Sequence, residues 1–120
     1  MPHPILASIL AFAAQAADPP PLTLPQLTLP QQTSLRCSAA FALVQRDRNT
    51  EPGSHPDYPN MDVRGKEFFI RTGLQLMEET GILEEQYEAM IYAELDQLAA
   101  PEKLAEVMPG CLLLLEASGI

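Results

Sequence analysis

The chain has 120 residues, of which 47% are hydrophobic and 19% are charged. This length allows one modest domain and excludes a two-domain enzyme, and the apolar fraction is too high for a wholly disordered protein. Seven basic residues against sixteen acidic ones leave a net charge of −9 at pH 7. That charge argues against a nucleic-acid backbone or an anionic membrane surface as the main partner.

The start of the chain has the pattern of a secretory signal peptide. Residues 5–14 are almost wholly apolar, and the small residues Ala14 and Ala16 fit cleavage after Ala16, with Ala17 as a second choice. The apolar run is about half of the ~20 residues that span a bilayer, so we expect no stable membrane anchor. An N-terminal core helix is the alternative. We expect residues 1–16 to be removed and the protein to be periplasmic or secreted.

A proline-rich segment is expected at residues 17–33. Within it, Leu22–Gln26 is repeated as Leu27–Gln31. Regularly spaced prolines remove backbone donors and favour extended chain, so we expect a semi-rigid linker. A docking peptide or an edge strand is the alternative. The folded domain is expected over residues 34–120.

This domain is predicted to be all-α, with four or five short helices, because no stretch alternates as a half-buried strand would. The first helix is expected from Leu35 to about Asp47, with Thr33 or Ser34 as its N-cap. Its apolar stripe has helical spacing and consists of Cys37, Ala40, Phe41 and Val44.

A long loop is predicted at residues 48–61, which hold three prolines and several turn-forming residues. His55 in this loop could form an acid–base pair with Asp57. No activated serine or free cysteine is recognisable beside the pair, so we predict no catalytic residue and a non-enzymatic protein. A small enzyme that uses this loop, with His55 as its base, is the least favoured alternative.

The second helix is predicted to run from a cap at Asn60 or Asp62 to about Thr80, with Gly81 closing it in the left-handed conformation. A glycine inside a helix is unfavourable by about 1 kcal/mol relative to alanine, so Gly73 predicts the close approach of another helix. The predicted apolar face consists of Phe69, Ile70, Gly73, Leu74, Leu76 and Met77.

The third helix is predicted over residues 83–98, and two shorter helices over 101–107 and 110–117, separated by Pro109. Leucines at positions 112–115 surround the last helix, which is typical of a helix that is central or covered by a partner. A buried strand is the alternative there. The stripe of the third helix, which only Glu94 interrupts, consists of Leu83, Tyr87, Met90, Ile91, Leu95 and Leu98.

Cys37 and Cys111 are predicted to form a disulfide, because exported chains with an even cysteine count most often pair them. Such a bridge would contribute roughly 4 kcal/mol of stability in the chain-entropy model. Free buried thiols are the first alternative. Redox chemistry is the second, although the wide spacing is not that of a catalytic dithiol.

The net charge lies in residues 78–120, which hold ten acidic residues and one basic residue, Lys103. Such an excess is typical of a solvated acidic face, and the alternative is a surface for a basic protein partner or a cation site. The sequence has no phosphate-binding loop, no metal-ligand spacing and no nucleophile elbow. We therefore expect neither a cofactor nor a metal site.

Three stretches carry a resemblance to known proteins: Arg36–Ala40, Arg64–Phe69 and Met108–Leu112. In them the chain resembles a group of small, exported, two-cysteine helical proteins of Gram-negative bacteria that carry no assigned function. The resemblance covers residues 35–118. It implies export and a helical fold, and it implies no activity.

The leading hypothesis is a periplasmic protein-binding or structural protein. Its partner, or a second copy in a homo-oligomer, would contact the leucine-rich last helix or the acidic C-terminal half. The alternative is an acid-responsive periplasmic chaperone, to which the plan of a small, acidic, disulfide-closed helical domain is similar. Well below pH 4 carboxylates are neutral, so the net charge of the protein would become positive. This inversion would loosen the domain and expose residues 112–115.

Overall fold

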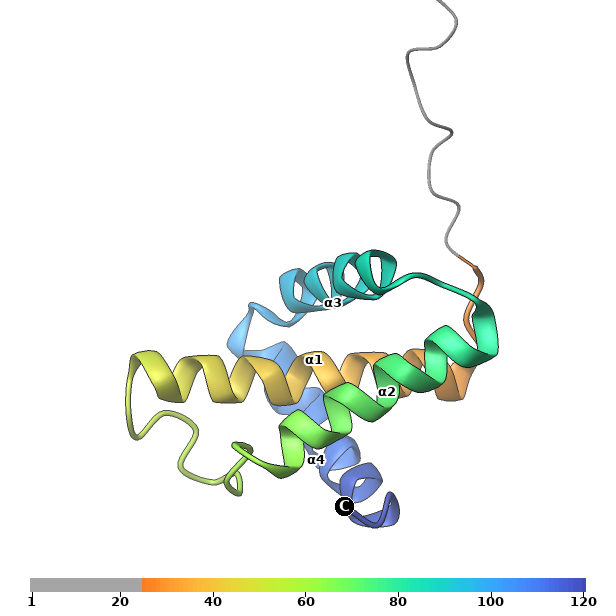
Figure 1. Cartoon of the computed structure of the whole chain (residues 1–120). Helices are drawn as coiled ribbons and strands as arrows, with labels where there is room; N and C mark the ends of the chain where they lie inside the picture. The colour runs from red at the N-terminus through yellow and green to blue at the C-terminus, as the bar shows by residue number, and fades with distance from the viewer. Residues whose placement is uncertain (1–24) are drawn as a thin grey trace, which may run out of the picture.

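The computed structural model describes residues 25–120, so the predicted signal peptide and most of the predicted linker lie outside the described residues. Over this range the chain forms four helices and no strand (Figure 1). They are α1 (Leu29–Thr50), α2 (Arg64–Thr80), α3 (Glu84–Leu98) and α4 (Pro101–Ala117). The predicted all-α class is confirmed, with four helices.

The central element is α1, and the other three helices pack around it (Figure 1). Ser38, Ala39 and Ala40 in its middle are completely buried. Their small side chains let neighbouring helices come close to the α1 backbone on more than one side. This is why a single helix can serve as the shared partner of three others.

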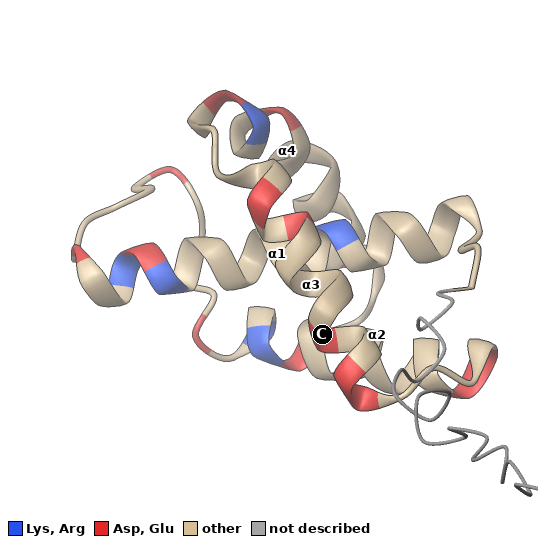
Figure 2. Ribbon diagram, turned by 90° about the horizontal axis from the view of Figure 1, so that it is seen from above, with Lys and Arg blue, Asp and Glu red and all other residues tan. Residues whose placement is uncertain are grey.

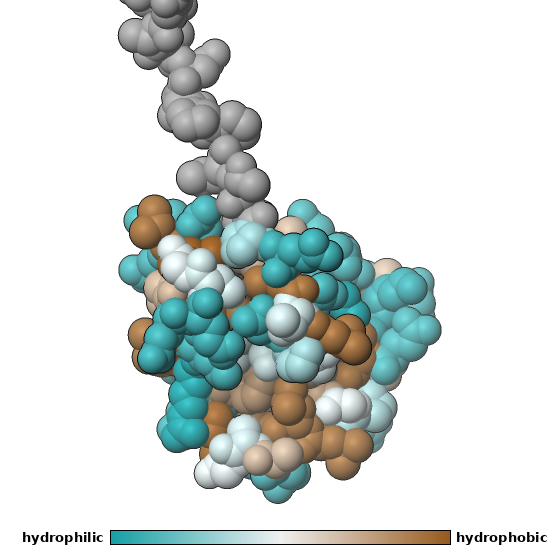
Figure 3. Space-filling view, turned by 90° about the vertical axis from the view of Figure 1, so that its right-hand side faces the viewer, coloured by the Kyte–Doolittle hydropathy of each residue, from teal (hydrophilic) through white to brown (hydrophobic). Residues whose placement is uncertain are grey.

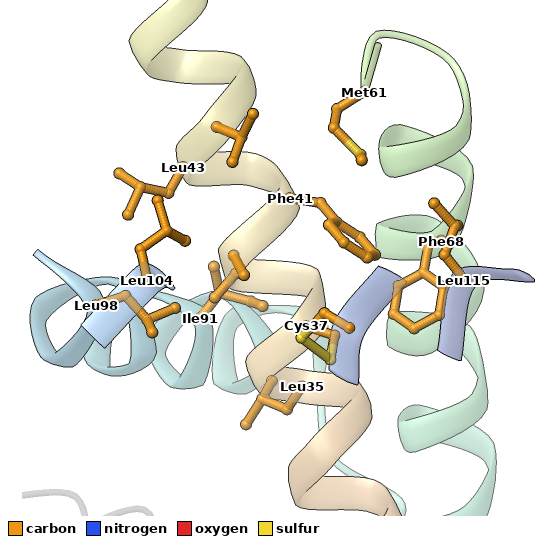
Figure 4. Packing of buried hydrophobic residues seen from close by; sticks show 14 of the residues in the cluster. Leu35, Cys37, Phe41, Leu43, Met61, Phe68, Ile91, Leu98, Leu104 and Leu115 are labelled. Atoms are coloured by element: carbon orange, nitrogen blue, oxygen red, sulfur yellow. A yellow bond between two sulfur atoms is a disulfide. The ribbon is translucent and has the colours of Figure 1, made fainter. Parts of the chain in front are cut away.

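The core lies on two sides of α1 (Figure 4). On the side of α2, the ring of Phe41 meets that of Phe68 edge to face, with ring centroids 5.2 Å apart. On the other side, Leu43 points toward Leu98 and Leu104, which come from the last residue of α3 and the first turns of α4. Edge-to-face packing of this kind is a favourable arrangement for an aromatic pair.

The predicted start of the first helix at Leu35 is wrong, because α1 begins at Leu29 inside the segment predicted to be extended. Thr28 is the N-cap: its Oγ1 accepts from the Gln31 N–H at 3.3 Å, while Gln31 Oε1 accepts from the Thr28 N–H at 2.9 Å. These two bonds form a capping box. Pro30 lies in the first turn, where a missing N–H costs nothing. The second copy of the repeat therefore begins the helix.

The predicted caps of the second helix are wrong, although its end is confirmed. Asn60 Oδ1 accepts from the Asp62 N–H at 2.8 Å and closes a turn before the helix, which begins at Arg64. The helix ends at Thr80, and Gly81 follows with a φ of 76°. That left-handed conformation strongly favours glycine.

The predicted break at Pro109 is wrong, because α4 runs through this proline as one helix. An interior proline removes one backbone hydrogen bond and costs about 3 kcal/mol or more in a helix without tertiary support. Here Met108 and Cys111, on either side of it, are buried in the core. Packing therefore keeps the helix continuous across the proline, and the helical residues 112–115 do not form the alternative strand.

Cys37 and Cys111 form a disulfide, as predicted. Their Cα atoms lie 5.1 Å apart although they are separated by 74 positions in sequence. Both residues are buried. The bond joins the middle of the central helix to the last helix of the domain.

Two ion pairs join the first half of the chain to its acidic second half. Arg36 Nε on α1 lies 3.3 Å from Glu94 Oε2 on α3, and Arg64 Nη2 on α2 lies 2.8 Å from Glu116 Oε1 on α4. The Glu94 side chain is only 14% exposed. Its pairing with Arg36 accounts for the one carboxylate in the apolar stripe of α3.

The close approach predicted at Gly73 is confirmed, and its partner is Tyr87 of α3. A Cβ atom at Gly73 would lie 2.6 Å from Tyr87 Cε1. The Tyr87 hydroxyl donates to the backbone carbonyl of Phe69 at 2.8 Å. Burial raises the pKa of Tyr87 to about 12.

Within residues 25–120, no helix combines the length and hydropathy that crossing a membrane requires.

Replacing both cysteines, Cys37→Ser with Cys111→Ser, is expected to lower the free energy of unfolding by about 4 kcal/mol, because the open chain regains the entropy that the bond removes. Chemical denaturation followed by circular dichroism measures this change. A reducing agent should lower the stability of the natural protein by a similar amount and leave the double variant unaffected. Equal stability of the disulfide-bonded natural protein and the double variant would contradict the prediction.

Gly73→Ala is expected to destabilise the domain by about 1–3 kcal/mol, since the added methyl group overlaps the Tyr87 ring. Gly110→Ala is the matched control, because a Cβ atom there meets nothing within 4 Å. It should instead stabilise α4 by about 0.5–1 kcal/mol through helix propensity alone. Thermal unfolding of both variants checks the opposite signs.

Candidate functional site

The surface is hollowed around the C-terminal half of α1, the start of α2 and the loop between them. Three adjoining hollows lie here, with volumes of about 510, 500 and 640 Å³. Gln45, Asn49 and Asp62 line both the first and the second, and Arg46 lines both the first and the third. The end of α1 therefore lies among three adjoining hollows of the surface.

The first hollow, which we call the α1–α2 groove, has an apolar floor and apolar walls. Its floor is formed by Phe41 and Met61, which are buried, and by Gly65. Ala42 on α1 and Ile70 on α2 line its sides. Apolar concave surfaces of this size commonly hold ligands or partner side chains.

Gly65 sets how closely α2 lies against α1 below the groove. A Cβ atom at this position would lie 3.1 Å from Met61 Cβ and 3.2 Å from Phe41 Cβ. A larger residue would therefore press on both floor side chains. Glycine lets the helices meet below the groove and leaves the space above them open.

An exposed apolar stripe on α2 continues the groove. Val63, Ile70 and Leu74 are 71%, 50% and 60% exposed, and their spacing of seven and four places them on one helix face. A different side of the molecule faces the viewer in Figure 3, where apolar side chains gather over the lower part, toward which the C-terminal end of α4 points in Figure 1. The prediction that Ile70 and Leu74 belong to the core is wrong: among the residues described they face solvent.

Two basic residues stand on the rim of the groove, Arg46 on α1 and Lys66 on α2. Lys66 makes no ion pair or side-chain hydrogen bond among the described residues. Arg46 Nε lies 3.9 Å from Asp47 Oδ1, while the other oxygen of Asp47 bonds to His55. The rim cations are thus weakly neutralised, although Asp62 also lines the groove.

His55 lies beside this site, but its partner is not the predicted Asp57. Its Nε2 atom is 2.7 Å from Asp47 Oδ2 on α1, and its ring stacks on that of Tyr58 with centroids 5.8 Å apart. A carboxylate bonded to one nitrogen can orient the imidazole of a general base. The neighbouring Ser54 Oγ donates instead to the Glu51 carbonyl at 2.6 Å.

Arg48 organises the loop, and nothing in the sequence distinguishes it from its neighbours. Its Nη2 atom donates to the carbonyls of His55 and Tyr58, at 2.6 Å each. Its Nη1 atom donates to the Pro59 carbonyl at 2.6 Å, and its Nε atom to that of Ser54 at 3.1 Å. Only a planar guanidinium presents several donors at fixed angles in this way, so the loop winds around one side chain.

The surfaces predicted from sequence lie elsewhere in the fold. In the last helix, Leu115 is buried, Leu112 and Leu114 are partly buried against the core, and Leu113 is 73% exposed. Acidic residues recur along α3 and α4, away from the end of α1 (Figure 2). The structure does not bring these acidic residues together with His55 into one site. Within residues 25–120 no group of three or more potential metal ligands forms a cluster.

Comparison with protein-family models, with curated proteins and with solved structures finds no match for this chain. The resemblance to small exported two-cysteine proteins therefore stays a prediction.

Arg48→Lys is expected to loosen the loop and to lower stability by about 2 kcal/mol, because hydrogen bonds from a charged donor contribute about 1.5–3 kcal/mol each and an ammonium group cannot reach all four carbonyls. Amide hydrogen exchange at Ser54 and Tyr58, which donate within the loop, should become faster. Arg46→Lys is the control, and unchanged loop exchange is expected in it. Equal exchange in both variants would show that Arg48 does not order the loop.

Proposed function

We propose that this protein is a non-enzymatic, extracytoplasmic protein-binding domain that holds an apolar helical segment of a partner in the α1–α2 groove. The observation that carries the proposal is the continuity of the groove with the exposed stripe of Val63, Ile70 and Leu74. An exposed apolar surface that joins a concave one is typical of an interaction site.

The shape of this surface favours a helical segment over a compact ligand. Val63 and Leu74 are eleven positions apart along the chain, which corresponds to about 16 Å along a helix axis at 1.5 Å per residue. Three turns of a partner helix match this length. Amphipathic helices bind apolar grooves through side chains at positions i, i+3, i+4 and i+7.

The arrangement around His55 supports binding over catalysis. The imidazole is oriented by Asp47, but a hydrolytic site also needs a nucleophile within hydrogen-bond distance of the base. Ser54 has its hydroxyl committed to the Glu51 carbonyl. The pair therefore supports a structural role, in which His55 joins the loop to α1.

The proposed location outside the cytoplasm is supported by the disulfide between Cys37 and Cys111. Disulfides persist in oxidising compartments and are rare in the cytosol. Export through a signal peptide at residues 1–16, followed by a proline-rich linker, forms part of the same proposal, as does the likeness to small exported two-cysteine helical proteins.

A synthetic 14-residue helical peptide with leucines on one face and glutamines elsewhere tests this function. Fluorescence anisotropy with the labelled peptide should show binding to the disulfide-bonded protein. Ala42→Phe fills the groove from α1 and should weaken binding by about tenfold or more, because loss of one buried apolar side chain is worth about 1.5–3 kcal/mol.

Ala93→Phe, at an exposed position on α3, is the matched control and should leave the affinity unchanged. Circular dichroism of both variants establishes that they are folded. Failure of the peptide to bind at millimolar concentration, or equal binding by the two variants, would overturn the proposal.

A further inference from the structure

We infer that the partner helix is acidic, with carboxylates on both sides of its apolar face that pair with Arg46 on one wall of the groove and Lys66 on the other. This inference rests on the proposed function, since it names the partner of the same groove. It is carried by charge, an observation separate from the apolar continuity used above.

Most basic side chains of the domain are already committed. All seven Lys and Arg residues lie in the described part of the chain. Ion pairs of 2.8–3.7 Å hold four of them, and carbonyl oxygens hold Arg48. The two that remain, Lys66 with no partner and Arg46 with one contact at 3.9 Å, both line the α1–α2 groove.

The position of these two cations selects a ligand with charge on both flanks. Arg46 belongs to α1 and Lys66 to α2, so they stand on different walls with the apolar floor between them. A helix about 10 Å across with an apolar stripe down its middle presents its flanking side chains to both walls. Carboxylates at those flanks would neutralise both cations, and Asp62 limits the excess of positive charge to one.

The net charge of −9 does not prevent this association. The charge excess belongs to residues 78–120, whereas the groove is lined by residues 41–70. At physiological ionic strength charges are screened over about 8 Å, so direct contacts at the rim outweigh the distant acids.

The test compares three helical peptides that share one apolar face and differ only in their flanking residues, which are glutamine, glutamate or lysine. Exposed ion pairs are each worth about 0.2–1 kcal/mol. We therefore expect the glutamate peptide to bind about fivefold to tenfold more tightly than the glutamine peptide, and the lysine peptide to bind most weakly. The preference for glutamate should disappear at 0.5 M salt.

Lys66→Glu should remove most of the preference for the glutamate peptide over the glutamine peptide. Lys103→Glu is the matched control: it makes the same change in net charge at an exposed residue of α4 outside the groove. It should leave the order of the three affinities unchanged. Arg46→Glu should act as Lys66→Glu does.

The outcomes separate this inference from the proposed function. Equal binding of all three peptides, blocked by Ala42→Phe, would overturn the acidic partner and leave the groove as a binding site. No binding of any peptide would overturn both. Displacement of the glutamate peptide by micromolar dodecanoate would indicate an acyl ligand instead. Self-association in sedimentation velocity that Lys66→Glu abolishes would indicate a second copy, and either result overturns the inference.

Discussion

The bond between Cys37 and Cys111 is the constraint on which the rest of the domain depends. The middle of α1 must pass close to three helices, and it does so with residues as small as Ser38 and Ala39. Small side chains allow close approach but remove little apolar area from water, so they hold neighbouring helices less strongly than large ones. A covalent link at this point joins α4 to α1 where side-chain packing alone is weak.

The distribution of charge is the second constraint, because the ion pairs between helices determine which basic residues remain unpaired at the groove. The second half of the chain is acidic, and two arginines of the first half form ion pairs with it. Arg36 of α1 pairs with Glu94 of α3, and Arg64 of α2 pairs with Glu116 of α4. Such partly exposed pairs contribute modestly to stability. Their larger effect is on where unpaired positive charge remains, because each arginine that pairs between helices has its charge neutralised there. What remains is concentrated beside the apolar floor of Phe41 and Met61.

Local chemistry made much of the fold predictable from sequence, and tertiary contacts decided the rest. The disulfide, the glycine end of α2 and the close approach at Gly73 all follow from residue type and spacing. The helix start at Leu29 was also readable, because Thr28 and Gln31 have the spacing of a capping box, but the repeated prolines favoured extended chain. Continuity through Pro109 depends on core packing.

The groove could not be predicted, since the position of Ile70 in the sequence does not say which face of α2 another helix covers. The Asp47–His55 pair and the carbonyls around Arg48 arise only once the loop has folded back.

The way in which Arg48 holds its loop has a consequence for molecular recognition. The loop carries Met61 and Asp62, which form one end of the groove, and it contains no helix or strand of its own. An unanchored segment of this kind would lose conformational entropy when a ligand ordered it. The cost in binding free energy would be about 1–2 kcal/mol for each residue fixed. Because a single guanidinium already gathers four carbonyls, that loss is incurred during folding. The groove is therefore preorganised, and under the proposed function association would proceed close to rigid-body docking.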